Sequence, residues 1–175
     1  DAVGLTLFGS KPGHFVPPRC RRSHLRLLMA AMVRNAPEGT TDVPASLRAA
    51  LHKLKRRGLV VLISDLIDQP EETLKAIRLI RGHRHDVVVF HVQDPAEAEF
   101  TFQGPTLFRD LETGEELEID PSAVRDDYLA RARDVNELYR KGLTDAGVSY
   151  HPVDTRQGYD TLLSAYLARR ARTRK

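Results

Sequence analysis

The chain has 175 residues, of which 41% are hydrophobic and 29% are charged, and it contains a single cysteine. This length is enough for one domain with a substantial buried core, and the composition is typical of a globular protein. No apolar run approaches the roughly 20 residues that span a bilayer, so the sequence argues against a membrane segment. One cysteine cannot form an internal disulfide, which favours a cytoplasmic protein.

The formal net charge is +3, and residues 169–175 alone contain five basic side chains. Without those five, the chain has 22 basic and 24 acidic residues, so we interpret the basic excess as a property of the tail. Basic side chains at the end of a helix also suit the helix dipole. Because stacking aromatic residues do not accompany this tail, the sequence argues against a nucleic-acid-binding protein.

Strands and helices are expected to alternate along the chain. Residues 2–8 indicate a strand, and residues 14–16 a short edge strand that ends at Pro17 and Pro18. A helix after Ser23 carries an apolar stripe that we expect to face the core, formed by Leu25, Leu28, Met29, Met32 and Val33. The next helix has the apolar positions Leu47, Ala50, Leu51 and Leu54, and a basic outer face, interpreted as solvated, of His52, Lys53, Lys55, Arg56 and Arg57.

Two later segments, residues 59–63 and 87–90, are apolar at every position. Strands that are covered by helices on both faces have this pattern, so a parallel sheet is expected. Between them, Asp68 and Glu71 resemble a capping box for a helix that contains Leu74, Ile77 and Ile80.

Residues 106–119 break the alternation and indicate a β-hairpin that turns at residues 112–114. Asp120 and Pro121 begin a long helix that Gly147 ends, and a strand over 148–153 and a last helix follow. The prediction is one doubly wound α/β domain over residues 1–175, with an inserted hairpin.

Ligands bind open α/β sheets at the carboxyl ends of the strands. Two polar segments are expected there, and they give a predicted binding surface of Thr40, Thr41, Asp42, Ser64 and Asp65. A purely structural alternative is that Thr41 caps the following helix and that Asp65 accepts hydrogen bonds from loop amides.

The two polar segments resemble the second and third parts of the metal-ion-dependent adhesion site of von Willebrand factor A-type domains. Five ordered segments, at family-like spacing, resemble the bacterial family catalogued as domain of unknown function fifty-eight: residues 1–9, 17–19, 62–66, 104–108 and 165–167. The resemblance implies a Rossmann-like sheet with strand order 3-2-1-4-5-6. Members are typically encoded beside AAA+ ATPases of the MoxR class, which implies such an ATPase as partner.

By this resemblance Thr41, or Thr40 in the alternative register, matches the threonine of the adhesion site, and Asp65 matches its later aspartate. The Asp-x-Ser-x-Ser loop and the first, central strand have no match. Mg²⁺ prefers six oxygen ligands in octahedral geometry, so this chain is expected to bind it weakly and a longer parent protein through a complete site. We therefore expect an N-terminally truncated domain. Its unpaired strand edges should make the isolated chain unstable, or pair directly with each other to close the gap, or cause dimerisation.

Several signatures of enzymes are missing, including the phosphate-binding loop, the dinucleotide fingerprint and the serine elbow. His83, His85 and His91 are spread over about 20 Å of extended chain, too far for one metal ion, and are interpreted as two solvated loop histidines and one at a strand end. The sequence thus favours a protein–protein interaction module, an adaptor or partner of the ATPase, over an enzyme. The alternative is a metal-dependent hydrolase with Asp65 as a ligand, which needs a general base that the sequence does not identify.

Overall fold

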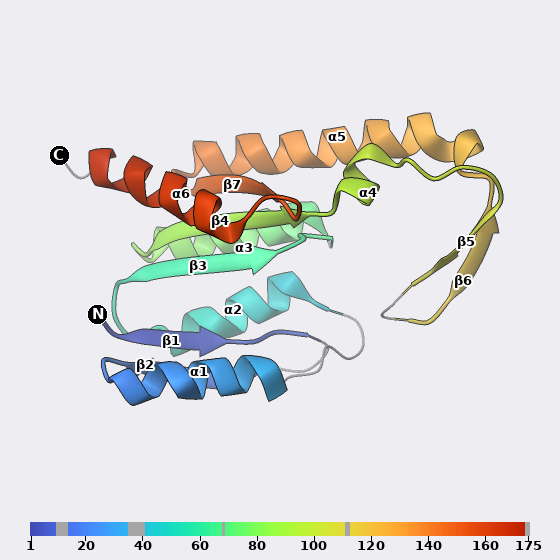
Figure 1. Ribbon diagram of the computed structural model, residues 1–175. Helices are drawn as coiled ribbons and strands as arrows, with labels where there is room; N and C mark the ends of the chain where they lie inside the picture. The colour runs from blue at the N-terminus through green and yellow to red at the C-terminus, as the bar shows by residue number, and fades with distance from the viewer. Residues whose placement is uncertain (10–13, 35–40, 68, 111–112, 174–175) are drawn as a thin grey trace.

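The computed structural model describes residues 1–9, 14–34, 41–67, 69–110 and 113–173. A parallel sheet in the order β3-β4-β7 forms the centre of the molecule (Figure 1). Its strands are β3 (Leu59–Ser64), β4 (Asp86–Gln93) and β7 (Ser149–Asp154). Antiparallel pairs are formed by β1 (Val3–Thr6) with β2 (Phe15–Arg19) and by β5 (Thr106–Arg109) with β6 (Glu116–Ile119).

Helices cover both faces of β4, which is why its sequence is apolar without alternation. On one face, Val89 packs in a core with residues of α3 (Pro70–Gly82) and α5 (Pro121–Asp145). On the other, the ring of Phe90 contacts Tyr166 of α6 (Tyr159–Thr173), with 5.6 Å between ring centroids. The predicted doubly wound α/β fold with a parallel sheet and a hairpin is confirmed (Figure 1).

The β1–β2 pair extends further than predicted. β2 continues through Pro17 and Pro18 to Arg19, so the expectation that these prolines end the strand is wrong. The pairing shifts register between Val3 and Leu5, and prolines are tolerated at such a bulge because no regular ladder hydrogen bond is needed there.

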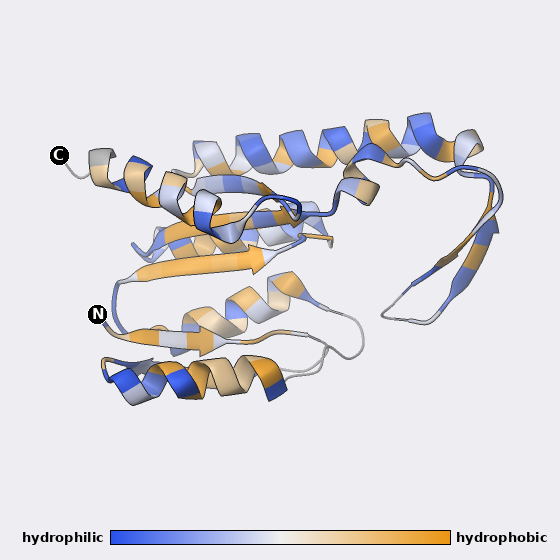
Figure 2. Ribbon diagram, viewed as in Figure 1, coloured by the Kyte–Doolittle hydropathy of each residue, from blue (hydrophilic) through white to orange (hydrophobic). Residues whose placement is uncertain are grey.

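The strands β1 and β3 each leave one edge unpaired within the described part of the chain. They belong to separate sheets, so the direct pairing of these two strands that was one expected outcome does not occur in the described residues. Apolar side chains of β3 are accessible next to this edge: Val61 is 46% and Ile63 63% exposed. Figure 2 shows that β3 is hydrophobic along its length.

The apolar stripe of α1 (Arg22–Arg34) does not face the core, contrary to the prediction. Leu28 is buried, but Met29 is 55% and Val33 86% exposed, and Leu25 and Met32 are exposed as well. The helix packs beside the small β1–β2 sheet (Figure 1), which is too narrow to cover the whole stripe. In α2 (Val43–Lys53), by contrast, Leu47 and Leu51 are buried as predicted.

The remaining helix boundaries are set by local capping. α3 begins at Pro70 with Gln69 in the N-cap position, and the predicted cap, Asp68, lies outside the described residues. The long helix α5 has the predicted Asp120 cap, whose carboxylate accepts from the Ser122 amide.

A short helix that was not predicted, α4 (Pro95–Glu99), follows β4. No helix in the described ranges is long and apolar enough to cross a membrane.

Candidate functional site

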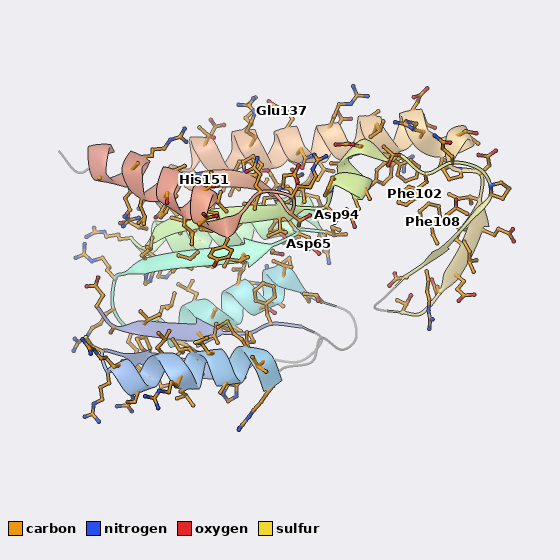
Figure 3. All side chains as sticks on the ribbon, in the orientation of Figure 1. Asp65, Asp94, Phe102, Phe108, Glu137 and His151 are labelled. Atoms are coloured by element: carbon orange, nitrogen blue, oxygen red, sulfur yellow. The ribbon has the colours of Figure 1, made fainter. Side chains whose placement is uncertain are left out.

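Acidic side chains follow the parallel strands at their carboxyl ends. Asp65 comes directly after β3, Asp94 follows β4, and Asp154 is the last residue of β7. Because the strands are parallel, these ends meet at one edge of the sheet, and Figure 3 shows Asp65 and Asp94 there. The N-terminal end of α2, next to Thr41 and Asp42, lies on the same side of the molecule (Figure 1). We call Asp65, Asp94 and Glu97 the acidic edge.

The turn that carries Asp65 has an unusual backbone. Leu66 has φ 56° and is buried, although the left-handed region disfavours residues with a side chain by about 1–2 kcal/mol. The Tyr139 hydroxyl donates to the Leu66 carbonyl over 3.2 Å, and the Leu66 amide donates to Ser64 Oγ over 3.1 Å. Such a conformation persists where the surroundings over-determine it, and this is common at functional sites.

His91 connects this turn to the core of the sheet. Its Nε2 lies 2.8 Å from the Asp65 carbonyl oxygen, and its Nδ1 lies 2.6 Å from the Tyr150 hydroxyl. A carbonyl only accepts, so Nε2 carries the hydrogen and Nδ1 accepts from Tyr150. Burial lowers the pKa of His91, and burial raises the pKa of Tyr150 to about 12, so both groups are neutral at pH 7. His91 lies near the end of its strand, as predicted, two residues before Gln93, and it is buried.

The Asp65 carboxylate itself is exposed and only partly engaged. Its Oδ1 accepts from the Ile67 amide over 3.3 Å and from Ser64 Oγ over 3.4 Å, as the structural alternative expected. A carboxylate offers about four acceptor positions, so these bonds leave capacity for a ligand.

The predicted site residues Thr41 and Asp42 lie at the N-terminal end of α2, and only Asp42 caps this helix. Asp42, not Thr41, caps α2, because its Oδ1 accepts from the Ala45 amide over 2.7 Å. The idea that Thr41 caps the helix is therefore wrong. Thr41 is half-buried beside this cap, and Thr40 lies outside the described residues.

Two acidic neighbours of Asp65 were not predicted from the sequence. Asp94 caps α4 by accepting from the Ala96 amide over 2.8 Å. Burial raises the pKa of Glu97, and the carboxylates of Asp94 and Asp65 raise it further. The available signal was an aspartate directly after each parallel strand.

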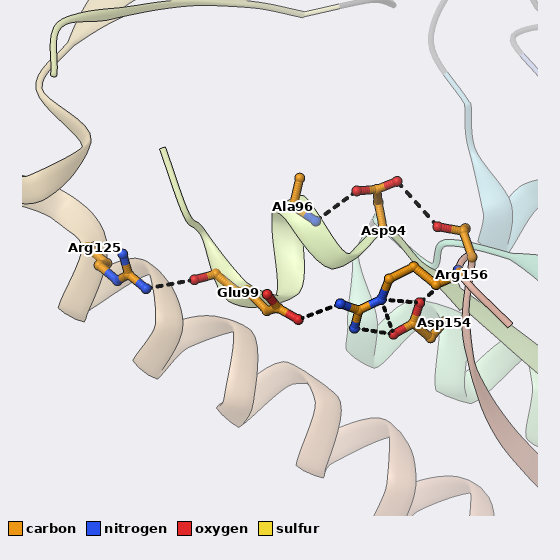
Figure 4. A network of polar contacts seen from close by, with 7 residues as sticks. Asp94, Ala96, Glu99, Arg125, Asp154 and Arg156 are labelled. Carbon is orange, nitrogen blue, oxygen red and sulfur yellow. Dashed lines mark hydrogen bonds and ion pairs between the residues drawn. The ribbon is translucent and has the colours of Figure 1, made fainter. Parts of the chain in front are cut away.

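Asp154, by contrast, is neutralised by a neighbouring arginine (Figure 4). Arg156 Nη2 lies 2.6 Å from Asp154 Oδ2, and Nη1 lies 2.9 Å from Glu99 Oε1. Arg125 donates to the Glu99 carbonyl over 3.0 Å, which ties α4 to α5. Hydrogen bonds from Arg156 lower the pKa of Asp154. Within the described ranges, Asp65 and Glu97 form no such ion pair, so the acidic edge keeps its negative charge.

A complete metal site is not present in the part of the chain that the structure describes. No group of three histidine, cysteine, aspartate or glutamate side chains there is arranged to hold an ion. Thr41 and Asp65 supply one hydroxyl and one carboxylate, whereas Asp42 and Asp94 already cap helices. These residues do not fit the six-oxygen shell that Mg²⁺ prefers.

Comparisons with known proteins agree with this fold. A family model described as "Protein of unknown function DUF58" matches residues 1–138. The uncharacterized protein Rv1480 of Mycobacterium tuberculosis is 35% identical over 122 residues, which are 67% of this chain and 38% of that protein. The uncharacterized protein MAV169 of Mycobacterium avium is 32% identical over 122 residues, 67% of this chain and 70% of that protein. The chain thus spans 38% of the length of Rv1480.

Two solved structures share the fold at low sequence identity. The conserved hypothetical protein BatB from Bacteroides thetaiotaomicron superposes with a TM-score of 0.56 at 15% identity, covering 98% of this chain and 80% of BatB. An aerotolerance-related membrane protein from Bacteroides fragilis superposes with a TM-score of 0.50 at 16% identity, covering 89% of this chain and 73% of that protein. At this identity the likeness concerns the fold alone.

Proposed function

The chain belongs to this family of proteins of unknown function, and we propose that it is a protein-binding module and not an enzyme. Its proposed contact surface is the acidic edge together with Thr41, Asp42 and Ser64. In this proposal the carboxylate of Asp65 binds a group of the partner and no bond is made or broken.

One observation carries the proposal: an exposed carboxylate lies on a turn whose backbone is hydrogen-bonded to buried side chains of the core. His91 and Tyr139 bond the carbonyls of two successive residues, Asp65 and the left-handed Leu66. A turn whose backbone is held before binding loses less conformational entropy when a partner orders it. Such preorganisation is more typical of a turn that recognises a partner than of a loop that is only solvated.

The proposed partner is an AAA+ ATPase of the MoxR class, in the cytoplasm, which rests on the family resemblance. The acidic edge supports a partner surface that carries basic side chains, because complementary charge accelerates and orients association. A Mg²⁺ ion between Asp65 and the partner needs oxygen ligands beyond those of the described residues.

The test is capture of the purified ATPase by the intact protein, with and without Mg²⁺. Asp65→Ala is compared with Asp134→Ala, which removes the same charge from an exposed position of α5. The proposal expects capture by the wild type and Asp134→Ala and loss with Asp65→Ala. Capture that Asp65→Ala leaves unchanged would show that the partner binds elsewhere.

A further inference from the structure

A basic pocket lies at the opposite end of β3 from Asp65. It has a volume of about 360 Å³ and is formed by the end of α2, the loop before β3 and the end of α3. Its permanent cations are Arg48, Lys55, Arg56 and Arg57, and no acidic residue is among its lining residues in the described chain. The pocket therefore concentrates positive charge, and of its four cations Arg48 lies 3.8 Å from a carboxylate oxygen of Glu72, which is not part of the lining.

Basic residues are also concentrated at the N-terminal end of the chain. Residues 1–57 hold 11 of the 27 basic and three of the 24 acidic residues, which leaves 16 basic against 21 acidic in the rest of the chain. The N-terminal third thus carries a basic excess of its own, in addition to the five basic side chains of residues 169–175. His52, Lys55, Arg56 and Arg57 line the pocket, whereas Lys53 lies over the Phe15 ring at 5.0 Å. The basic face of this helix, which was predicted to be solvated, is therefore divided between the pocket and the Phe15 ring.

His85 gives an independent indication of a ligand. It lines the pocket and is only 3% exposed, so its interpretation as a solvated loop histidine is wrong. Its Nδ1 is buried and has no hydrogen-bond partner in the described structure. Buried polar atoms are nearly always hydrogen-bonded, and an unpaired one calls for an explanation such as an absent ligand. A ligand oxygen near His85 supplies that partner.

We propose that this pocket binds a small anion that carries phosphate groups. Arginine pairs with phosphate through parallel N–H donors, and a multiply charged anion makes better use of several cations than a single carboxylate does. The volume is at the lower end of the range of about 300–1,000 Å³ for small-molecule sites. His83 donates from Nδ1 to the Leu79 carbonyl over 2.8 Å, which fixes a second imidazole in the lining.

The proposal is independent of the acidic edge. The pocket lies at the amino end of β3 and Asp65 at its carboxyl end, about 20 Å apart along an extended strand of this length. The two sites can therefore be tested separately.

The experiment titrates pyrophosphate, inorganic phosphate and acetate into the intact protein by isothermal calorimetry at fixed ionic strength. The test variant is Arg56→Gln with Arg57→Gln, and the control is Arg131→Gln with Lys141→Gln, which removes equal charge from exposed positions of α5. A second readout is the ¹⁵N signal of His85 Nδ1, which reports on the pocket without any substitution. A short single-stranded oligonucleotide is titrated in parallel.

We expect pyrophosphate to bind more tightly than phosphate, acetate to show no binding, and the pyrophosphate affinity to fall at least tenfold in the test variant and less than twofold in the control. The His85 signal should shift as pyrophosphate is added. Equal losses in both variants, or an unmoved His85 signal, would overturn the proposal, because binding would then be nonspecific. Tighter binding of the oligonucleotide than of pyrophosphate, lost in the test variant, would also overturn it and assign this surface to nucleic acid.

Discussion

The Nε2 atom of His91 donates to the carbonyl oxygen of Asp65 over 2.8 Å, and this bond joins the interior of the sheet to its acidic edge. The register of the parallel strands makes it possible, because Ser64 of β3 is paired with His91 of β4. A buried ring therefore holds the backbone of the residue that carries an exposed carboxylate.

The first prediction concerns this bond. His91→Phe should lower the free energy of unfolding by about 1–3 kcal/mol, because it removes the hydrogen-bond partner of the Tyr150 hydroxyl and of the Asp65 carbonyl. His91→Gln, which keeps an N–H donor, should recover part of the loss. Urea unfolding measures both. Equal stability of the two variants would mean that the hydrogen bond contributes nothing beyond packing.

A second prediction concerns the contact between α3 and α5. A methyl group at Gly142 would lie 2.9 Å from a Leu74 side-chain carbon, so Gly142→Ala should destabilise the protein by about 1–3 kcal/mol. Gly82→Ala is the matched control, since no atom lies within 4 Å of a methyl group there. Thermal unfolding of the two variants should separate them, and a loss in Gly82→Ala as large as in Gly142→Ala would refute this account of the packing.

A third prediction concerns pH. Burial lowers the pKa of His151, and the nearby Arg169 lowers it further. At a pH just below the ordinary histidine pKa of about 6.5, the folded state then binds fewer protons than the unfolded state. The free energy of unfolding is therefore highest at pH values above the ordinary histidine pKa, and it decreases as the pH falls toward the folded-state pKa of His151. His151→Phe should show a shallower decline in unfolding free energy from about pH 7 to about pH 5.

The titration of the His151 ring can be followed directly by NMR. A midpoint at or above about 6.5 would contradict the expected depression. His91 changes stability in the same direction, because burial lowers its pKa too, so His151→Phe should reduce the pH dependence without abolishing it.

The open strand edges lead to a fourth prediction. The 175-residue chain should self-associate as its concentration rises, because β3 presents an unpaired apolar edge in the described structure. Ile63→Lys should reduce the association, since a charged side chain on an edge strand discourages pairing. Leu107→Lys, at an equally exposed position of the hairpin, is the control. Sedimentation velocity over a concentration series measures the effect, and a wild-type monomer throughout would contradict it.

Much of the fold could be predicted because local patterns reflect burial. The apolar runs of β3 and β4 predicted a parallel sheet, and Asp120 with Pro121 predicted the start of α5. The same pattern wrongly indicated helices on both faces of β3, where Val61 and Ile63 are exposed. The prediction that the apolar stripe of α1 faces the core was wrong. Helical spacing shows which side chains share a face, but it does not show whether another element covers that face.

The site was predicted only in part. Asp65 was found because it directly follows an apolar strand, but Glu97 belongs to a helix too short to show periodicity. The basic pocket joins Arg57 and His85, which precede neighbouring strands and come together because Leu59 is paired with Asp86. Such pairings between distant segments depend on register, which the sequence alone did not reveal.

The most direct test of the central claim is the dissociation constant between the intact protein and the MoxR-class ATPase, measured for Asp65→Asn and Asp134→Asn. Asparagine preserves the shape of the side chain and removes its charge, so folding should be unchanged in both variants. The account predicts at least a tenfold weaker complex for Asp65→Asn and an unchanged one for Asp134→Asn. Equal affinity of the two variants would contradict the claim that the acidic edge is the contact surface.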